Sequence, residues 1–165
     1  VTTVGGGVPA AGGSPASGIY RPNGDVSLGS WTDNESGTSN IYTNIDDAVT
    51  APTAGDGNAI REWETGTVYE CAFPEITGTI STVRVHHYSQ KGGSAAGSLS
   101  FYVSQDGSNW SSEQTSALSG AEVWAWYYVD FSVTWTNTSD LRVRIDADAS
   151  GHVFAVDTLY IEANP

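Results

Sequence analysis

The stretch Val123-Trp-Ala-Trp-Tyr-Tyr-Val-Asp-Phe131 decides the fold class of this chain, because its residues alternate strictly between two sets. One set is Val123, Ala125, Tyr127, Val129 and Phe131, and the other is Trp124, Trp126, Tyr128 and Asp130. Successive side chains of a β-strand point to opposite faces of its sheet, so an alternation of period two predicts a strand. No part of the sequence shows a convincing helical period.

The same alternation recurs on both sides of this stretch. It predicts strands at residues 68–73, 79–88, 98–104, 141–145 and 153–161, and weaker ones at 25–31, 40–46 and 58–63. Turn-forming runs separate several of them, such as Gln105-Asp-Gly-Ser108 and Lys91-Gly-Gly-Ser94. Strands and turns at these spacings predict an all-β fold: a two-sheet antiparallel β-sandwich of the jelly-roll type, with an extended N-terminal arm.

The arm is the segment 1–19, VTTVGGGVPAAGGSPASGI, which contains six glycines, two prolines and no charged residue. Such a segment cannot bury enough apolar surface to fold alone. We therefore expect residues 20–165 to form the sandwich domain and the arm to dock on a neighbouring subunit. It would add a strand there through Val1, Thr2, Thr3 and Val4, with Val8 further along. The chain would then be one unit of a homo-oligomer or polymer.

The charge balance excludes two classes of partner. Six Lys and Arg stand against 19 Asp and Glu, for a net charge of −13. Phosphate binding needs clustered cations, so neither nucleic acid nor an anionic membrane surface is expected as a partner. No run approaches about 18 consecutive apolar residues, so no membrane insertion is expected either. The single cysteine, Cys71, allows no internal disulfide and is expected to be a small buried side chain.

Both ends of the domain carry motifs that resemble known modules. The opening is Arg21-Pro-Asn-Gly-Asp-Val-Ser-Leu-Gly-Ser-Trp31, and the closing strands are Leu141-Arg-Val-Arg-Ile145 and 153–162. Together they resemble jelly-roll modules of phage structural and tail proteins and of bacterial surface proteins. More loosely, they are similar to galactose-binding-like carbohydrate-binding modules. The first resemblance implies an extracellular, cell-surface or virion location. The second implies a polysaccharide partner and a structural calcium near Asp157, with Asp25 beside it.

The residues themselves also suggest a calcium loop. Asp146, Asp148 and Ser150 are spaced as the first oxygen ligands of such a loop, with Gly151 next and Asp157 at position 12. The alternative is a plain turn between two strands, which uses the same residue types.

Asp157 shares its strand phase with apolar residues, so its carboxylate is expected to point inward. A buried carboxylate needs a partner, which would be calcium together with Asp25, or an arginine such as Arg142 or Arg144.

The aromatic stripe of Trp124, Trp126 and Tyr128 admits three interpretations. A face of the sandwich core is the one we favour. A protein interface and a platform on which sugar rings stack are the others. Trp110 lies in a turn and is expected to be the most exposed of the aromatic residues.

Three N-glycosylation sequons occur, at Asn34, Asn109 and Asn137, which is close to the number expected by chance.

Catalytic patterns are absent from the sequence. His86 and His87 are neighbours in a strand and point to opposite faces, so they cannot chelate one ion together. Glu62 and Glu64 share a face, as a glycosidase pair would, but alternating acids on a solvated strand are far more common. No nucleophile elbow, zinc spacing or phosphate loop occurs. We predict no enzyme, no catalytic residue and no cofactor other than a structural calcium.

Two functions follow from these features. The leading one is a non-enzymatic structural subunit of an extracellular or virion assembly, such as a surface filament, decoration or tail component. The alternative is a carbohydrate-binding module that uses Trp110, Trp124 and Trp126.

Overall fold

The computed structural model describes residues 17–33, 39–45, 58–62, 68–93, 97–119, 122–147 and 153–165. Within these ranges lie eleven strands and one short 3₁₀ helix. The elements are β1 (Gly18–Tyr20), β2 (Gly24–Ser27), β3 (Thr32–Asp33), η1 (Ile41–Asn44), β4 (Ile60–Glu62), β5 (Val68–Ala72), β6 (Thr79–Lys91), β7 (Gly97–Ser104), β8 (Gln114–Leu118), β9 (Ala125–Thr136), β10 (Arg142–Ala147) and β11 (Phe154–Ala163).

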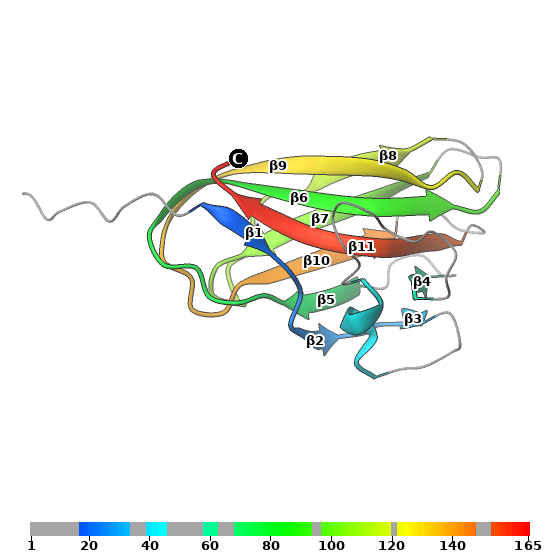
Figure 1. Cartoon of the computed structure of the whole chain (residues 1–165), viewed down its shortest axis with the longest axis horizontal. Coiled ribbons are helices and arrows are strands. Elements are labelled where there is room, and N and C mark those ends of the chain that lie inside the picture. Colours follow the sequence, from blue (N-terminus) through cyan, green and yellow to red (C-terminus); the bar gives the residue numbers. More distant parts are fainter. Residues whose placement is uncertain are drawn as a thin grey trace, which may run out of the picture.

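The strands form two antiparallel sheets that face each other, which confirms the predicted sandwich (Figure 1). The front sheet has the order β3-β4-β11-β6-β9, and β1 pairs with the far end of β11. The back sheet has the order β2-β5-β10-β7-β8. The long strands β6, β9 and β11 give the front sheet a broad outer face. No helix in the described ranges is long and apolar enough to cross a bilayer.

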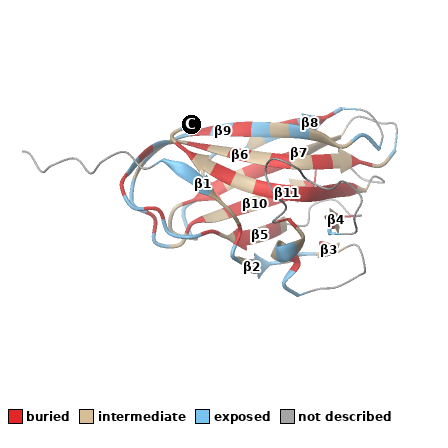
Figure 2. Ribbon diagram, viewed as in Figure 1, coloured by how far each residue is buried: buried red, intermediate tan, exposed pale blue. Residues whose placement is uncertain are grey.

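The core fills the space between the sheets. Figure 2 shows buried residues along β11 and along β7 and β10 behind it. Alternate residues of each strand supply the core: Val83, Val85, Val129, Phe131, Leu159 and Ile161 from the front sheet, and Tyr69, Leu99, Phe101, Val103, Val143 and Ile145 from the back sheet. Cys71 is also buried there, as expected. Replacing one of the large side chains of this core by alanine typically lowers the free energy of unfolding by about 2–5 kcal/mol.

The weak strand predicted at residues 40–46 is wrong, because this segment forms the 3₁₀ helix η1. Two features turn the chain here. Asn40 has a φ of 56°, in the left-handed region that asparagine tolerates. The carboxylate of Asp25 then accepts hydrogen bonds from the backbone N–H groups of Ile41 and Tyr42, at 2.8 and 2.9 Å. Ile41 and Ile45 are thereby buried against the core.

Asp25 therefore anchors η1 to the sandwich, and it also accepts a hydrogen bond of 2.8 Å from the hydroxyl of Tyr69. We expect Asp25→Ala to lower the free energy of unfolding by about 2–4 kcal/mol, because three donors lose one charged acceptor. Urea unfolding at neutral pH measures the change. The exposed Glu75→Ala is the control, with an expected change below about 0.5 kcal/mol. Equal midpoints for the two variants would contradict the anchoring role.

Candidate functional site

The outer face of the front sheet carries a regular lattice of aromatic and charged side chains. Strand register places them in three rows across β11, β6 and β9. The rows are Thr158, Tyr88 and Trp126; Tyr160, His86 and Tyr128; and Glu162, Arg84 and Asp130. Trp124 stands immediately before β9, next to the first row. We call the six rings of Tyr88, Trp124, Trp126, Tyr128, Tyr160 and His86 the aromatic face.

The rings of the aromatic face are in continuous contact. Their centroid separations are 5.5 Å for Trp124–Tyr88, 5.3 Å for Tyr88–Trp126, 5.9 Å for Trp126–Tyr160, 4.3 Å for Tyr160–His86 and 6.0 Å for His86–Tyr128. These are the separations at which aromatic pairs attract one another. Each ring is therefore held in place by its neighbours, and the face is already arranged before any ligand arrives.

Trp126 and Tyr128 are exposed, with 40% and 57% of their surface accessible. The favoured interpretation of the Trp124, Trp126 and Tyr128 stripe as a core face is therefore wrong. The alternating set that contains Val129 and Phe131 faces the core instead. Neighbouring exposed rings on a protein surface usually mark an interaction site. A protein interface and a sugar platform remain the two predictions for this stripe.

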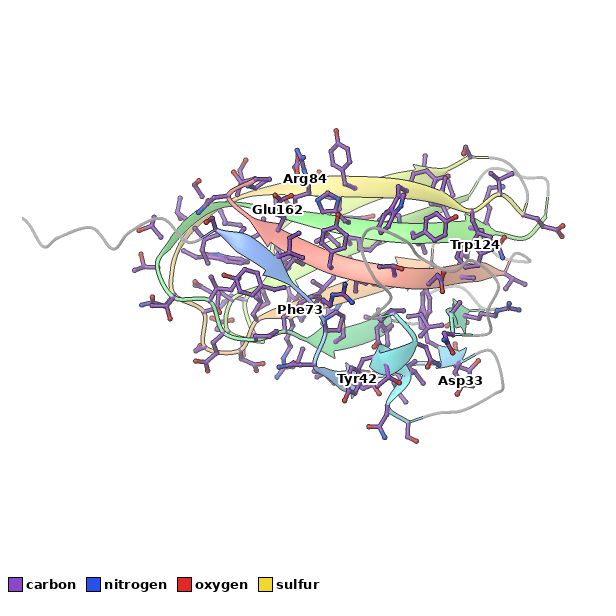
Figure 3. All side chains as sticks on the ribbon, in the orientation of Figure 1. Asp33, Tyr42, Phe73, Arg84, Trp124 and Glu162 are labelled. Atoms are coloured by element: carbon purple, nitrogen blue, oxygen red, sulfur yellow. The ribbon has the colours of Figure 1, made fainter. Side chains whose placement is uncertain are left out.

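One end of the lattice is charged. Arg84 donates two hydrogen bonds to the carboxylate of Asp130, at 2.7 and 2.8 Å, and its guanidinium lies 4.3 Å from the ring centroid of Tyr128. Nε2 of His86 lies 3.2 Å from a carboxylate oxygen of Glu162. Figure 3 shows Arg84 and Glu162 near one end of β6 and β11, and Trp124 near the other end of β6. The lattice therefore offers stacking surfaces along its length and hydrogen-bonding groups at one end.

The protonation states follow from these contacts. The hydrogen bonds from Arg84 lower the pKa of Asp130, so this carboxyl is ionised at neutral pH. Burial lowers the pKa of His86 despite the opposing influence of Glu162, so the imidazole is neutral there. Burial also raises the pKa of Tyr160, whose hydroxyl keeps its proton. At neutral pH the lattice thus presents the hydroxyl of Tyr160, the neutral imidazole of His86 and the carboxylate of Asp130 beside the guanidinium of Arg84.

Trp110 lies apart from this lattice and is half-buried, so the expectation that it is the most exposed aromatic residue is wrong. The guanidinium of Arg144, from β10 of the back sheet, lies 4.0 Å from its ring centroid. Trp110 lines a groove of about 570 Å³ between the 105–112 loop and the edge of β9. Among the described side chains, no ring contact joins it to the aromatic face.

The predicted calcium ligands are only partly described. Asp148 and Ser150 lie outside the described residues, and Asp146 is the next-to-last residue of β10. Asp157 is fully buried in β11, where a bulge interrupts the register with β6. The described ranges contain no group of three His, Cys, Asp or Glu placed to hold a metal ion. The calcium site stays a prediction.

The arginines considered as partners of Asp157 bind other carboxylates. Arg142 bonds to Asp140 at 2.5 Å and lies 3.7 Å from Glu70, and Arg144 bonds to Glu70 at 2.6 Å. Glu70 belongs to β5, and Arg142 and Arg144 belong to β10, both in the back sheet. Asp140 lies just before β10, whereas Asp157 lies in the front sheet.

The residues weighed for catalysis do not share an open site. His86 faces outward and His87 is fully buried, as their neighbouring positions in a strand require. Glu62 is also fully buried and accepts a hydrogen bond of 2.7 Å from Ser30, so the solvated strand expected for it is wrong. Glu64 lies outside the described residues.

The remaining predicted positions are placed as follows. Nδ2 of Asn109 donates a hydrogen bond of 2.7 Å to Asp106, and Oδ1 of Asn137 accepts one of 2.7 Å from the backbone N–H of Gly78. Asn34 and the arm residues Val1, Thr2, Thr3, Val4 and Val8 lie outside the described residues. Glycosylation and docking of the arm stay predictions.

Searches of sequence families and of curated proteins find no match to this chain. Solved structures do resemble it. The CBM22-1 xylan-binding domain of Paenibacillus barcinonensis Xyn10C has a TM-score of 0.50 at 17% identity, and the match covers 91% of this chain and 97% of that domain. The CBM22-1-GH10 modules of Clostridium thermocellum xylanase 10B, complexed with xylohexaose, give 0.49 at 11% identity over 92% of this chain and 29% of that one. TmCBM61 in complex with β-1,4-galactotriose gives 0.40 at 16% identity over 91% and 89%. The first of these shows that the chain shares the β-sandwich fold of that domain.

Proposed function

We propose that this chain is a non-catalytic carbohydrate-binding module whose aromatic face binds a polysaccharide. The observation that carries the proposal is the pair of exposed rings, Trp126 and Tyr128, in a pre-arranged lattice with charged groups at one end. Sugar rings have an apolar C–H face that stacks on aromatic rings and a rim of hydroxyls that exchange hydrogen bonds. The lattice supplies partners for both.

The geometry favours an extended chain of sugars over a single ring. Trp124, Trp126 and Tyr128 follow one another at every second residue, so they span about 13 Å along the strand. A chain lying along β9 would contact these rings in turn. Its hydroxyls would then reach Asp130 and Arg84 at the charged end of the lattice.

The charge of the chain favours a neutral polysaccharide. A net charge of −13 repels polyanions such as polyuronates at moderate ionic strength. The fold likeness to a xylan-binding domain supports a neutral plant-type polysaccharide as the first candidate. Such polymers lie outside cells, so we also propose an extracellular location.

The assembly function expected for the N-terminal arm is a separate prediction. In the described part of the chain the arm is represented only by Ser17, Gly18 and Ile19, and the last two belong to β1, which pairs with the end of β11. If the chain assembles, its subunits would contact one another through the aromatic face. The experiment must therefore distinguish polysaccharide binding from self-association.

Affinity gel electrophoresis provides the test. We expect a gel containing xylan, mixed-linkage β-glucan or galactan to slow the protein relative to a non-binding protein of similar size and charge. A gel containing the polyanion alginate should leave its mobility unchanged. Sedimentation velocity on the same sample reports self-association. A chain that none of the neutral polysaccharides retards, but that associates with itself, would contradict the proposal.

A further inference from the structure

A groove lies at the edge of the front sheet, where β9 is the last strand. One wall of the 570 Å³ groove is formed by six consecutive residues of β9, 130–135. Consecutive residues of a strand can line one groove only where the groove runs along the strand edge. The other wall comes from the loop after β7 and from Gln114 at the start of β8. The volume is in the range typical of small-molecule sites.

The loop wall is rigidly built. The carboxylate of Asp106 accepts hydrogen bonds from the backbone N–H groups of Ser108 and Asn109, at 2.9 and 2.8 Å, and from the side-chain amide of Asn109. Gly107 has a φ of 70°, and a side chain there would collide with Asp140 and Arg142. These contacts fix the turn that leads into Trp110, and they hold the pKa of Asp106 well below its usual range.

The indole of Trp110 is fixed by contacts with Arg144 and by the hydrogen bonds of the residue that follows it. Glu70 accepts two hydrogen bonds from Arg144, at 2.6 and 3.0 Å, and the guanidinium of Arg144 lies over the indole. The next residue, Ser111, bonds to both the backbone N–H and the carbonyl of Val103. One face of the indole is therefore covered, and the ring is fixed as a wall of the groove.

The chemistry of the lining is that of a site for a neutral, hydroxyl-rich ligand. Two indoles, Trp110 and Trp135, offer stacking surfaces. Three amides, Gln105, Asn109 and Gln114, supply hydrogen-bonding groups, and one of the donors of Asn109 is already bonded to Asp106. No lysine or arginine lines the groove, so it is unsuited to a phosphate or carboxylate ligand.

From these features we infer that the groove is a second saccharide site, in which one or two sugar units contact Trp110, Trp135 and the three amides. The inference rests on the proposed function, from which it takes the ligand class. Asp130 belongs to both surfaces, because it ends a row of the lattice and also lines the groove. The two sites thus lie on either side of the β9 edge and bind separate segments of polysaccharide.

The test is an NMR titration of the full ¹⁵N-labelled chain with xylohexaose, and in parallel with cellohexaose, up to millimolar concentration. Indole N–H signals report each tryptophan separately. We expect the signals of Trp110 and Trp135 to move in wild type and in the double variant Trp126→Ala/Tyr128→Ala. In Trp110→Ala we expect the groove signals to stay still while the signals of the aromatic face still move. Trp110→Phe, which keeps a ring, should retain groove binding if the alanine variant is poorly folded.

Each outcome separates the two proposals. Shifts confined to the aromatic face would overturn the groove inference and leave the proposed function standing. Groove shifts that persist in the double variant support the inference. If neither set of signals moves with either sugar, both proposals fail. Groove signals that move on dilution without sugar would mean that a second copy of the chain docks on the β9 edge, which also overturns the inference.

Discussion

Replacing both Trp126 and Tyr128 by alanine is expected to weaken binding of the best polysaccharide ligand by at least about 30-fold. These are the two most exposed rings of the lattice, and their neighbours already hold them in place. Central aromatic anchors of this kind typically contribute about 2 kcal/mol or more each to binding, and 1.4 kcal/mol is a factor of ten. Isothermal titration calorimetry with the matching oligosaccharide measures the loss.

The matched control is Tyr102→Ala, which removes a tyrosine from β7 in the back sheet. This variant should bind with wild-type affinity, and thermal melts should show that all variants are folded. Equal weakening in the control and in the double variant would mean that the aromatic face is not the site. Because Trp126 and Tyr128 point away from the core, their removal should change stability by less than about 1 kcal/mol.

Acidification from pH 7 to pH 5 is expected to destabilise the fold by about 2 kcal/mol through His87 alone. His87 is fully buried between the sheets, where Ser89 and Ser116 contact its two ring nitrogens at 2.8 and 3.0 Å. The rings of Phe101 and Tyr127 pack against the imidazole. Burial, with a smaller contribution from the neighbouring His86, lowers its pKa from 6.5 to about 3.

The sign follows from the two pKa values. Between pH 6.5 and about 3 the unfolded chain binds a proton at His87 that the folded chain does not, so stability falls as pH falls through this window. Each pH unit below 6.5 lowers the free energy of unfolding by about 1.4 kcal/mol. His86 has a lowered pKa as well and acts in the same direction. The interval from pH 7 to 5 lies above the titration range of most carboxyl groups, which isolates the histidines.

Urea unfolding at the two pH values provides the measurement. His87→Gln keeps hydrogen-bonding groups near both serines but cannot titrate. The fall in its free energy of unfolding between pH 7 and pH 5 should therefore be about 2 kcal/mol smaller than in wild type. His86→Gln is the comparison at the half-buried neighbour and should retain most of the wild-type pH dependence. A His87→Gln variant as acid-sensitive as wild type would contradict the assignment.

The sequence predicts the long strands of this fold well, because alternation is strong wherever one face is buried. It misses β8, whose segment Gln114–Leu118 has few apolar residues, and it mistakes η1 for a strand. The helix depends on capping by Asp25, which lies 16 residues away along the chain. Local patterning cannot report a partner at that distance.

The candidate site shows a similar limit. Alternation separates Trp124, Trp126 and Tyr128 from Val129 and Phe131, but both sets contain large apolar side chains, so the pattern does not say which set is buried. The decision depends on pairing with β6 and β11. The sequence does carry a signal, since His86 and Tyr88 alternate with the buried Val85 and His87, and Tyr160 and Glu162 alternate with Leu159 and Ile161. The three stripes lie on β6, β9 and β11, and the sequence does not show that these strands are neighbours. The aromatic face can therefore be predicted only when the strand order is known.

The pairing of β1 with β11 determines how the domain responds to pulling. Gly18 lies opposite Ala163 and Tyr20 opposite Ile161, so the two ends of the folded unit are adjacent on one sheet edge. Tension applied between these ends loads one pair of hydrogen bonds at a time and peels β1 away, whereas shearing would load all of them together. The three-residue β1 would therefore detach at low force, before the longer strands separate. Strands β6 and β9, which carry the aromatic rows, would stay paired under the same tension.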